Sequence, residues 1–422
     1  MEETKVLHKN KVLTPKLRFK EFNDVAPDTF YKKHLFKDIF NFSSGKNIKQ
    51  NEASPEFEIP CVRYGELYHM YNEVISEVFN RTNLDKSELI FSEGNEILLP
   101  SAGEDPLDIG SASALTIENI AIGRTINILK PIKDDTYSQI YVSYYINEKL
   151  RKKISTLAKG VSISNVYNSD LKTLEITLPN LPEQNKVASF LSEVDKKIRI
   201  LKQKMEVLKQ YKKGVMQQLF SGKLRFKDEN GKAYPNWEER LLESMCELKN
   251  GFAFKSTSYS SEGEYKVVTI KNVQDGYMTN DFSRILSPPG NLEIHQKLKK
   301  GDILISMTGN VGRVCRVSFE NCLLNQRVGK LEVKNINPDY FYHLINNEEF
   351  QDEMIGAGQG AAQMNIGKKD ILGVRRLTAS SIEEQKKIAD FLSAIDVKID
   401  CLNAQITQTQ NFKKGLLQQM FV

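Results

Sequence analysis

Residues 182–220 read PEQNKVASFLSEVDKKIRILKQKMEVLKQYKKGVMQQLF, and residues 383–421 read EEQKKIADFLSAIDVKIDCLNAQITQTQNFKKGLLQQMF. The two stretches align without gaps and are identical at 17 of 39 positions. Residues 16–20 and 223–227 also share one sequence, Lys-Leu-Arg-Phe-Lys. Self-similarity at a fixed period indicates a duplicated structural unit. The chain is therefore a tandem repeat in which a variable globular part precedes a well-preserved helical part.

Apolar residues recur in both helical parts at alternating spacings of four and three residues. This a/d heptad pattern predicts a long helix whose apolar seam packs on a partner helix. The natural partner is the other copy, because a second seam in the same chain has a high effective concentration. The long connector permits either direction, but a pseudo-two-fold axis between duplicated units favours an antiparallel coiled coil. The seam residues are Val187, Leu191, Val194, Ile198, Leu201, Met205, Leu208, Ile388, Leu392, Ile395, Ile399, Leu402 and Ile406.

The globular parts combine short β-rich runs with helical stretches, which predicts a mixed α/β fold. Residues 96–99, 124–129, 266–270 and 302–305 are the clearest β runs, and 337–354 is helical in pattern. We expect two tandem globular domains joined by two long helices. The expected divisions are an N-terminal arm (1–15), a first domain (16–180), a central helix (181–222), a second domain (223–380) and a distal helix (381–422).

The composition places few limits on function. A formal net charge of +5 is too mild to identify a polyanionic partner. No apolar run reaches the ~18 residues that cross a bilayer, and the first residues are polar. We therefore expect a soluble, cytoplasmic protein with no membrane partner. The five cysteines have no metal-ligand spacing, so we expect neither a disulfide framework nor a metal site.

The starts of the two helical parts resemble those of a known family. Leu181-Pro182-Glu183-Gln184 and Ile382-Glu383-Glu384-Gln385 each lead into a Phe-Leu pair. With the repeat, these motifs resemble the specificity subunits of type I restriction–modification systems. In the second motif Ile382 and Glu383 replace Leu-Pro. The resemblance covers nearly the whole chain.

This resemblance implies a function in DNA recognition. Each globular part would be a target recognition domain that reads one half of a split sequence in double-stranded DNA. The paired helices would hold the two domains apart and dock methyltransferase (modification) subunits, two of them, and through these the restriction/translocase subunits. The chain itself would bind no cofactor. S-adenosylmethionine, ATP and Mg²⁺ would belong to the partner subunits.

Base readout in the major groove uses Arg, Lys, Asn, Gln and Ser/Thr side chains on loops. Residues of these types, with one tyrosine, are candidates in both domains. Each is individually as compatible with an exposed loop or a structural cap as with DNA contact, and only the set favours contact. The candidates are Arg63, Tyr64, Ser101 and Arg124 in the first domain and Lys271, Asn272, Thr308, Asn310, Arg313, Gln326 and Arg327 in the second.

Three sequence patterns suggest catalysis, but each has a simpler interpretation. Asn337-Pro338-Asp339-Tyr340 resembles the base-gripping motif of amino-methyltransferases, yet its third residue is wrong and a capped helix start explains it. Asp302, Glu332 and Lys334 provide the two carboxylates and the lysine that a magnesium nuclease uses, but an ordinary exposed strand face explains them as well. Residues 356–360 are glycine-rich without dinucleotide spacing, which favours a turn after a helix.

We therefore assign no catalytic residue and predict a recognition subunit that is not an enzyme. The alternative is a self-contained restriction endonuclease or adenine methyltransferase, which would need an intact cofactor or metal motif. A coiled-coil adaptor that binds only proteins is a third possibility, and footprinting on DNA would separate it from a recognition subunit.

Overall fold

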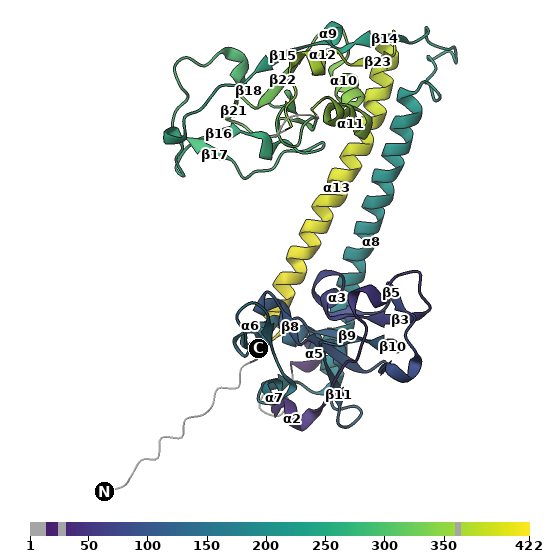
Figure 1. Cartoon of the computed structure of the whole chain (residues 1–422), viewed down its shortest axis with the longest axis vertical. Helices are drawn as coiled ribbons and strands as arrows, with labels where there is room; N and C mark the ends of the chain where they lie inside the picture. Colours follow the sequence, from purple (N-terminus) through teal and green to yellow (C-terminus); the bar gives the residue numbers. More distant parts are fainter. Residues whose placement is uncertain (1–13, 24–30, 359–363) are drawn as a thin grey trace. The chain divides into compact units, whose positions relative to one another are not determined.

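The computed structural model describes residues 14–23, 31–358 and 364–422. The chain divides into two compact units, residues 1–202 with 404–422 and residues 203–403. Both boundaries fall inside the long helices, so each unit contains one mixed α/β domain and one half of the helix pair (Figure 1). The predicted N-terminal arm, 1–15, lies almost wholly outside the described residues.

The two predicted long helices are α8 (Leu181–Phe220) and α13 (Ile382–Met420). In the first unit the start of α8 packs on the end of α13, with Leu191 and Leu416 in one core. In the second unit the end of α8 packs on the start of α13, where Leu219 and Ile388 share a core. The helices therefore run antiparallel, as the repeat predicts.

Burial of the seam explains why these two stretches are helical along their whole length. Helices longer than a few turns depend on tertiary packing of an apolar face, and the heptad spacing provides that face. Every predicted seam residue is buried or half-buried. The buried ones are Val187, Leu191, Val194, Ile198, Ile388, Leu392, Ile395, Leu402 and Ile406; the half-buried ones are Leu201, Met205, Leu208 and Ile399.

Polar caps set the ends of the long helices. The Asn180 side chain accepts a hydrogen bond from the Glu183 amide at the start of α8, and Ser381 accepts one from the Glu384 amide at the start of α13. Gly222 follows α8 with a φ of 72° and donates its N–H to Leu219. The left-handed backbone conformation at this position favours glycine, and it closes the last turn of the helix.

The Lys-Leu-Arg-Phe-Lys repeats occupy equivalent positions on these helix ends. The amide of Leu224 donates to the carbonyl of Gln218, 3.0 Å away at the end of α8. The amide of Leu17 donates to the carbonyl of Gln419, also 3.0 Å away, at the end of α13. Each globular domain therefore begins on the end of a long helix.

The first domain, residues 31–178, contains two principal sheets. One has the strand order β2-β11-β7-β9-β4 and the other β5-β3-β10-β6, with two-stranded pairs β1-β13 and β12-β8. The strands are β1 (Lys32–Leu35), β2 (Phe40–Ser44), β3 (Ile59–Val62), β4 (Val74–Ile75), β5 (Asn80–Thr82), β6 (Phe91–Glu93), β7 (Glu96–Pro100), β8 (Ala102–Gly103), β9 (Ser113–Leu115), β10 (Glu118–Ile122), β11 (Ile126–Pro131), β12 (Ser164–Asn165) and β13 (Glu175–Leu178).

The second domain, residues 238–378, repeats this plan. Its sheets have the orders β15-β22-β19-β20 and β17-β16-β21-β18, with the pair β14-β23. The strands are β14 (Glu238–Leu241), β15 (Cys246–Asn250), β16 (Tyr265–Val268), β17 (Ser283–Ile285), β18 (Lys297–Leu298), β19 (Ile303–Ser306), β20 (Val314–Arg316), β21 (Cys322–Leu324), β22 (Val328–Val333) and β23 (Arg375–Thr378).

The two domains share strand pairing and one close backbone approach. The parallel pair β3–β10 corresponds to β16–β21, and the antiparallel pair β2–β11 corresponds to β15–β22. Gly45 follows β2, where an added Cβ would lie 2.0 Å from the Gly123 carbonyl oxygen. Gly251 follows β15, where an added Cβ would lie 2.1 Å from the Asn325 oxygen. A side chain at either position would displace the neighbouring loop.

Short helices complete each domain and cover its sheets. In the first domain they are α2 (Phe36–Ile39), α3 (Tyr64–His69), α4 (Pro106–Ile109), α5 (Gln139–Tyr145), α6 (Arg151–Thr156) and α7 (Asn168–Leu171), with a π-helical turn η4 (Ile146–Leu150) between α5 and α6. In the second they are α9 (Leu242–Met245), α10 (Pro338–Ile345), α11 (Glu348–Ala357) and α12 (Lys368–Leu372). Six 3₁₀ turns accompany them among the described residues: η1 (Lys20–Phe22), η2 (Gln50–Glu52), η3 (Lys86–Glu88), η5 (Ser256–Ser258), η6 (Ile270–Asn272) and η7 (Ile294–Gln296).

The helical stretch expected at 337–354 is two helices rather than one. The chain leaves helical geometry at Asn346, and the Asn347 side chain caps α11 by accepting a hydrogen bond from the Phe350 amide. Asparagine favours such caps over helix interiors because its side chain bonds the nearby backbone. None of the helices in the described part of the chain is long and apolar enough to cross a membrane.

Candidate nucleic-acid interface

A buried ion pair fixes each globular domain to the start of a long helix. The Arg18 guanidinium lies 2.7 Å from the Glu183 carboxylate, and that of Arg225 lies 2.8 Å from Glu384. Both carboxylates are buried. The hydrogen bond to Glu183 raises the pKa of Arg18, as that to Glu384 raises the pKa of Arg225. The domain and its helix are thus held by the same charge-assisted contact in both repeats.

The next residue of each helix makes a second duplicated contact. Gln184 accepts a hydrogen bond from the Ser138 amide, and Gln385 accepts one from the Asn337 amide, each over 2.9 Å. Ser138 and Asn337 directly precede the equivalent helices α5 and α10. The Glu-Gln motif of the long helices is therefore a docking element for the domains.

In the first domain, the loops at one end of the larger sheet form a continuous edge. The Ser101 amide donates to Thr125, the Val166 amide donates to Ser101, and the Arg124 amide donates to Asn47. We call residues 44–47, 101, 123–125 and 164–166 the first loop edge. Two predicted base readers, Ser101 and Arg124, lie on it, and Arg124 is exposed.

The other two candidates of the first domain lie beside this edge. Tyr64 is exposed, and the amide of Gly123 donates to the carbonyl of Val62 just before it. The Arg63 side chain, however, donates to the buried Glu66 carboxylate over 2.7 Å and to the carbonyl of Gln50. Arg63 therefore supports the loop within the protein.

The second domain has an equivalent edge. The Gln326 amide donates to the carbonyl of Phe252, and the Met307 amide donates to that of Arg327. We call residues 250–252, 269–275, 306–313 and 325–327 the second loop edge. Four predicted readers on it are exposed: Lys271, Asn310, Gln326 and Arg327. Lys271 lies 3.5 Å from the exposed carboxylate of Asp281.

The remaining candidates of the second domain are used inside the protein. Asn272 is fully buried, and its side chain bonds Thr269, Thr279 and Asp281. Thr308 is buried and donates its hydroxyl to Asn365. The Arg313 guanidinium lies 2.5 Å from the Gln274 side-chain oxygen and 3.7 Å from Asp275, and so joins two loops of the edge.

The catalytic-looking patterns have structural roles. Asn337 caps α10 by accepting hydrogen bonds from the Asp339 and Tyr340 amides, as its simpler interpretation predicts. Between Asp302 and Glu332 lies Lys330, whose ammonium is 2.9 Å from Asp302 and 3.6 Å from Glu332. Among the described residues, no group of His, Cys, Asp and Glu has a metal-binding arrangement. Gly356 and Ala357 end α11, whereas residues 359–360 lie outside the described part.

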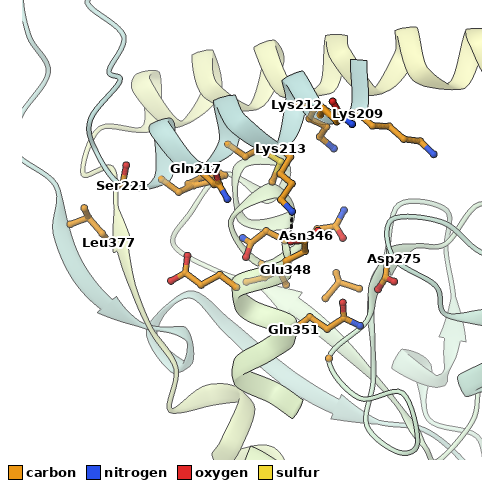
Figure 2. Close-up of a pocket in the computed structure, with 18 of the residues that line it drawn as sticks. Lys209, Lys212, Lys213, Gln217, Ser221, Asp275, Asn346, Glu348, Gln351 and Leu377 are labelled. Carbon is orange, nitrogen blue, oxygen red and sulfur yellow. Dashed lines mark hydrogen bonds and ion pairs between the residues drawn. The ribbon is translucent and has the colours of Figure 1, made fainter. Parts of the chain in front are cut away.

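A groove of about 910 Å³ lies in the second unit between the end of α8 and the α10–α11 corner. Lys209, Lys212 and Lys213 face it from α8, opposite Asn346 and Glu348 (Figure 2). The Lys213 ammonium pairs with the Glu348 carboxylate across the groove. Its lining combines apolar side chains, such as Met216 and Phe220, with side chains of both signs of charge.

Comparison with known proteins identifies the family. The profile described as "Type I restriction modification DNA specificity domain" matches residues 31–210 and again residues 234–410. The chain belongs to this family. It carries two copies of the specificity domain, which the internal repeat and the duplicated sheets independently indicate.

Named relatives agree with this assignment. The MjaVIII specificity subunit of Methanocaldococcus jannaschii is 27% identical over 352 residues, which cover 79% of this chain and 80% of that protein. The EcoKI specificity subunit of Escherichia coli K12 is 22% identical over 86% of this chain and 82% of its own. These relatives are named specificity subunits of restriction enzymes, so the alternative of a self-contained nuclease or methyltransferase has no support.

A solved structure shares the fold. The S subunit of a type I restriction–modification system from M. genitalium superposes with a TM-score of 0.64 at 19% identity, over 97% of this chain and 99% of that one. The specificity-subunit fold, with two recognition domains and an antiparallel helix pair, is therefore the fold of this chain.

Some residues of the specificity domains escaped the sequence prediction. Lys46 is exposed on the first loop edge, and its neighbour Asn47 has a φ of 53°. Asparagine tolerates this left-handed conformation better than most residues, so Gly45-Lys46-Asn47 was the available signal for a turn after a strand. In the second domain, His295 bonds the carbonyl of Asn250 beside the second loop edge, and no sequence pattern marks it.

Proposed function

We propose that each recognition domain reads one half of a split DNA sequence with its loop edge. The observation that carries this proposal is the duplication of the edge. In both domains equivalent strands end beside loops that present exposed cationic and amide side chains, Arg124 in the first and Arg327 in the second among them. Such side chains form the strongest pairings with base edges in the major groove.

The candidate residues divide into two roles under this proposal. Six exposed side chains contact the DNA: Tyr64, Arg124, Lys271, Asn310, Gln326 and Arg327; the half-buried Ser101 lies beside Arg124 on the first loop edge and joins them. The remaining four side chains stabilise the conformation of the loops through hydrogen bonds within the protein: Arg63, Asn272, Thr308 and Arg313. Contacts to phosphates position a protein on DNA, whereas contacts to base edges specify the sequence.

The helix pair docks the modification subunits. The end of α8 lines the groove of the second unit, and one face of that helix is left exposed. Tyr211 of α8 and Phe412 of α13 hold equivalent repeat positions, and both aromatic side chains are exposed. Aromatic side chains are enriched at protein interfaces. Because the two positions are equivalent, each can bind one copy of the same modification subunit.

The chemistry belongs to the partners. Modification subunits would carry S-adenosylmethionine and methylate adenine, and restriction/translocase subunits would use ATP and Mg²⁺. This chain would bind none of these cofactors, would contribute recognition alone, and would act in the cytoplasm, where the DNA is.

Exchange of one recognition domain tests the proposal. Residues 223–379 are replaced by the corresponding segment of a relative, and the chimaera is expressed with its modification subunit. Sequencing of the methylated adenines should show one half of the site changed and the other half retained, because each domain has its own core. Coordinated change of both halves would refute independent reading, and absence of methylation in the unaltered complex would refute the assignment itself.

A further inference from the structure

The loop at residues 159–165 of the first domain is held in one shape by its own backbone. The Lys159 amide donates to the Asn165 carbonyl over 2.9 Å, and the Asn165 amide donates back to Lys159 over 2.8 Å. Gly160 has a φ of 133°, and a Cβ there would lie 2.1 Å from the Ile163 carbonyl oxygen. Only glycine fits this turn, so the side chains that follow it have fixed directions.

The tip of this loop presents apolar side chains to solvent. Val161 is fully exposed, and Ile163 is 58% exposed. Tyr167, just beyond the loop, is 56% exposed. Such side chains add little to the stability of the fold, because they bury little apolar area. We therefore expect these side chains to contact another molecule.

The loop is continuous with the first loop edge. The Val166 amide donates to Ser101, and the Asn168 side chain donates to the carbonyl of Ser43 at the end of β2. Exposed Lys46 and Arg124 lie on the same edge, bonded to Ile122 and Asn47 through their amides. The apolar tip thus adjoins a cationic edge, and this combination fits a DNA groove, where phosphates surround the bases.

We infer that Val161 and Ile163 contact the 5-methyl groups of thymines in the major groove of the half-site that the first domain reads. This inference rests on the proposed function and names the chemical group that the loop recognises. The thymine methyl is the apolar group that distinguishes base edges in the major groove, and aliphatic side chains pair with it. A half-site that contains a methylatable adenine necessarily contains a thymine opposite it.

The test removes the methyl group from the DNA and its contact from the protein. The site is first read from the methylome, and the complex with its modification subunits is then titrated onto duplexes in which each thymine in turn is replaced by deoxyuracil. For the unaltered complex, loss of one buried methyl should weaken binding about fourfold at one or two positions of the first half-site. Val161→Ala with Ile163→Ala should bind the thymine and deoxyuracil duplexes equally.

The control is Ile132→Ala, which truncates an exposed isoleucine just past the other end of β11. This variant should keep the fourfold difference. The inference is overturned if no thymine of the first half-site shows a methyl effect, or if the doubly substituted loop retains it. The inference is also overturned if the double substitution weakens binding to the thymine duplex and to the deoxyuracil duplex by the same factor. The loop would then contact the sugar–phosphate backbone. A complex without any sequence preference would instead refute the proposed function.

Discussion

The ammonium of Lys212 on α8 lies 2.5 Å from the carboxylate of Asp396 on α13. Its repeat counterpart is the pair Lys413 and Asp195, 2.8 Å apart, in the other unit. The same two repeat positions therefore meet in both units with the helices exchanged, as an isologous two-fold contact requires. Each carboxylate also faces a residue of the domain helix: Tyr144 donates to Asp195 over 2.5 Å, and His343 lies 3.9 Å from Asp396.

Removal of the Lys413 cation should destabilise the first unit. Its ammonium lies between the carboxylates of Asp195 and Glu73, and its side chain is only 14% exposed. Lys413→Met leaves two carboxylates facing each other without a cation, and we expect a loss of about 2–3 kcal/mol, near the lower range for buried pairs. Urea unfolding measures it. The exposed neighbour is the control, since Lys414→Met should change the free energy by less than about 0.5 kcal/mol; equal losses would contradict the ion-pair argument.

His343 should make the stability of the second unit depend on pH. Burial first, then the Lys212 and Arg316 cations, lower the pKa of His343 to about 3. Below about pH 6.5 the unfolded chain binds a proton on this residue that the folded chain does not, so the free energy of unfolding falls as the pH falls. Between pH 7 and pH 5 the loss should be about 2 kcal/mol.

Replacement of His343 by the residue of the other repeat tests this dependence. The equivalent position is Tyr144, so His343→Tyr, with His343→Gln as a smaller alternative, should remove about 2 kcal/mol of the difference in unfolding free energy between pH 7 and pH 5. Exposed His69 is the control, and His69→Asn should leave the difference unchanged. A pH profile identical in all variants would show that folding leaves the pKa of His343 unchanged, and would contradict the prediction.

The Arg225 ion pair should stabilise the second unit. The Glu384 carboxylate is fully buried and accepts hydrogen bonds from Arg225 and from the indole of Trp237. Arg225→Ala leaves a buried carboxylate with one neutral donor, and we expect a loss of about 3 kcal/mol. Trp237 is the sole tryptophan, so its fluorescence reports this unit directly. Arg225→Ala with Glu384→Gln should recover much of the loss; no recovery would mean that packing alone is responsible.

Arg327 and Lys271 should affect binding in different ways. If the exposed Arg327 guanidinium contacts guanine, Arg327→Ala should cost about 1–3 kcal/mol of binding free energy and relax one base position of the second half-site. Lys271→Ala should weaken binding to all sequences alike and reduce its salt dependence, as loss of a phosphate contact does. Methylome sequencing and salt titrations separate the two. Uniform weakening by Arg327→Ala would reassign it to the phosphate backbone.

The helix pair was predictable because its signal is local and periodic. A seam residue such as Leu191 repeats with its neighbours every seven positions, and the duplicated sequence shows the partner in the same chain. The β strands at 96–99 and 302–305 were found for a similar reason, since short buried strands are continuous apolar runs.

The candidate site was predictable only by residue type. Asn272 and Arg124 are equally plausible base readers in the sequence, yet one is fully buried and the other exposed. Their difference depends on partners distant in the chain, such as Thr279 and Asp281 around Asn272. The exposed Val161 tip escaped prediction because apolar residues in a sequence are normally assigned to the core.

The hydrogen bond between Leu17 and Gln419 has a topological consequence. It matches the bond between Leu224 and Gln218, but only the latter joint is also covalent, through residues 219–223. Each unit thus contains the same contact between the start of a domain and the end of a long helix, once across a few peptide bonds and once without them. A short linker across the Leu17–Gln419 contact should therefore permit a cut of the chain between Gln218 and Leu224 with both hydrogen bonds kept.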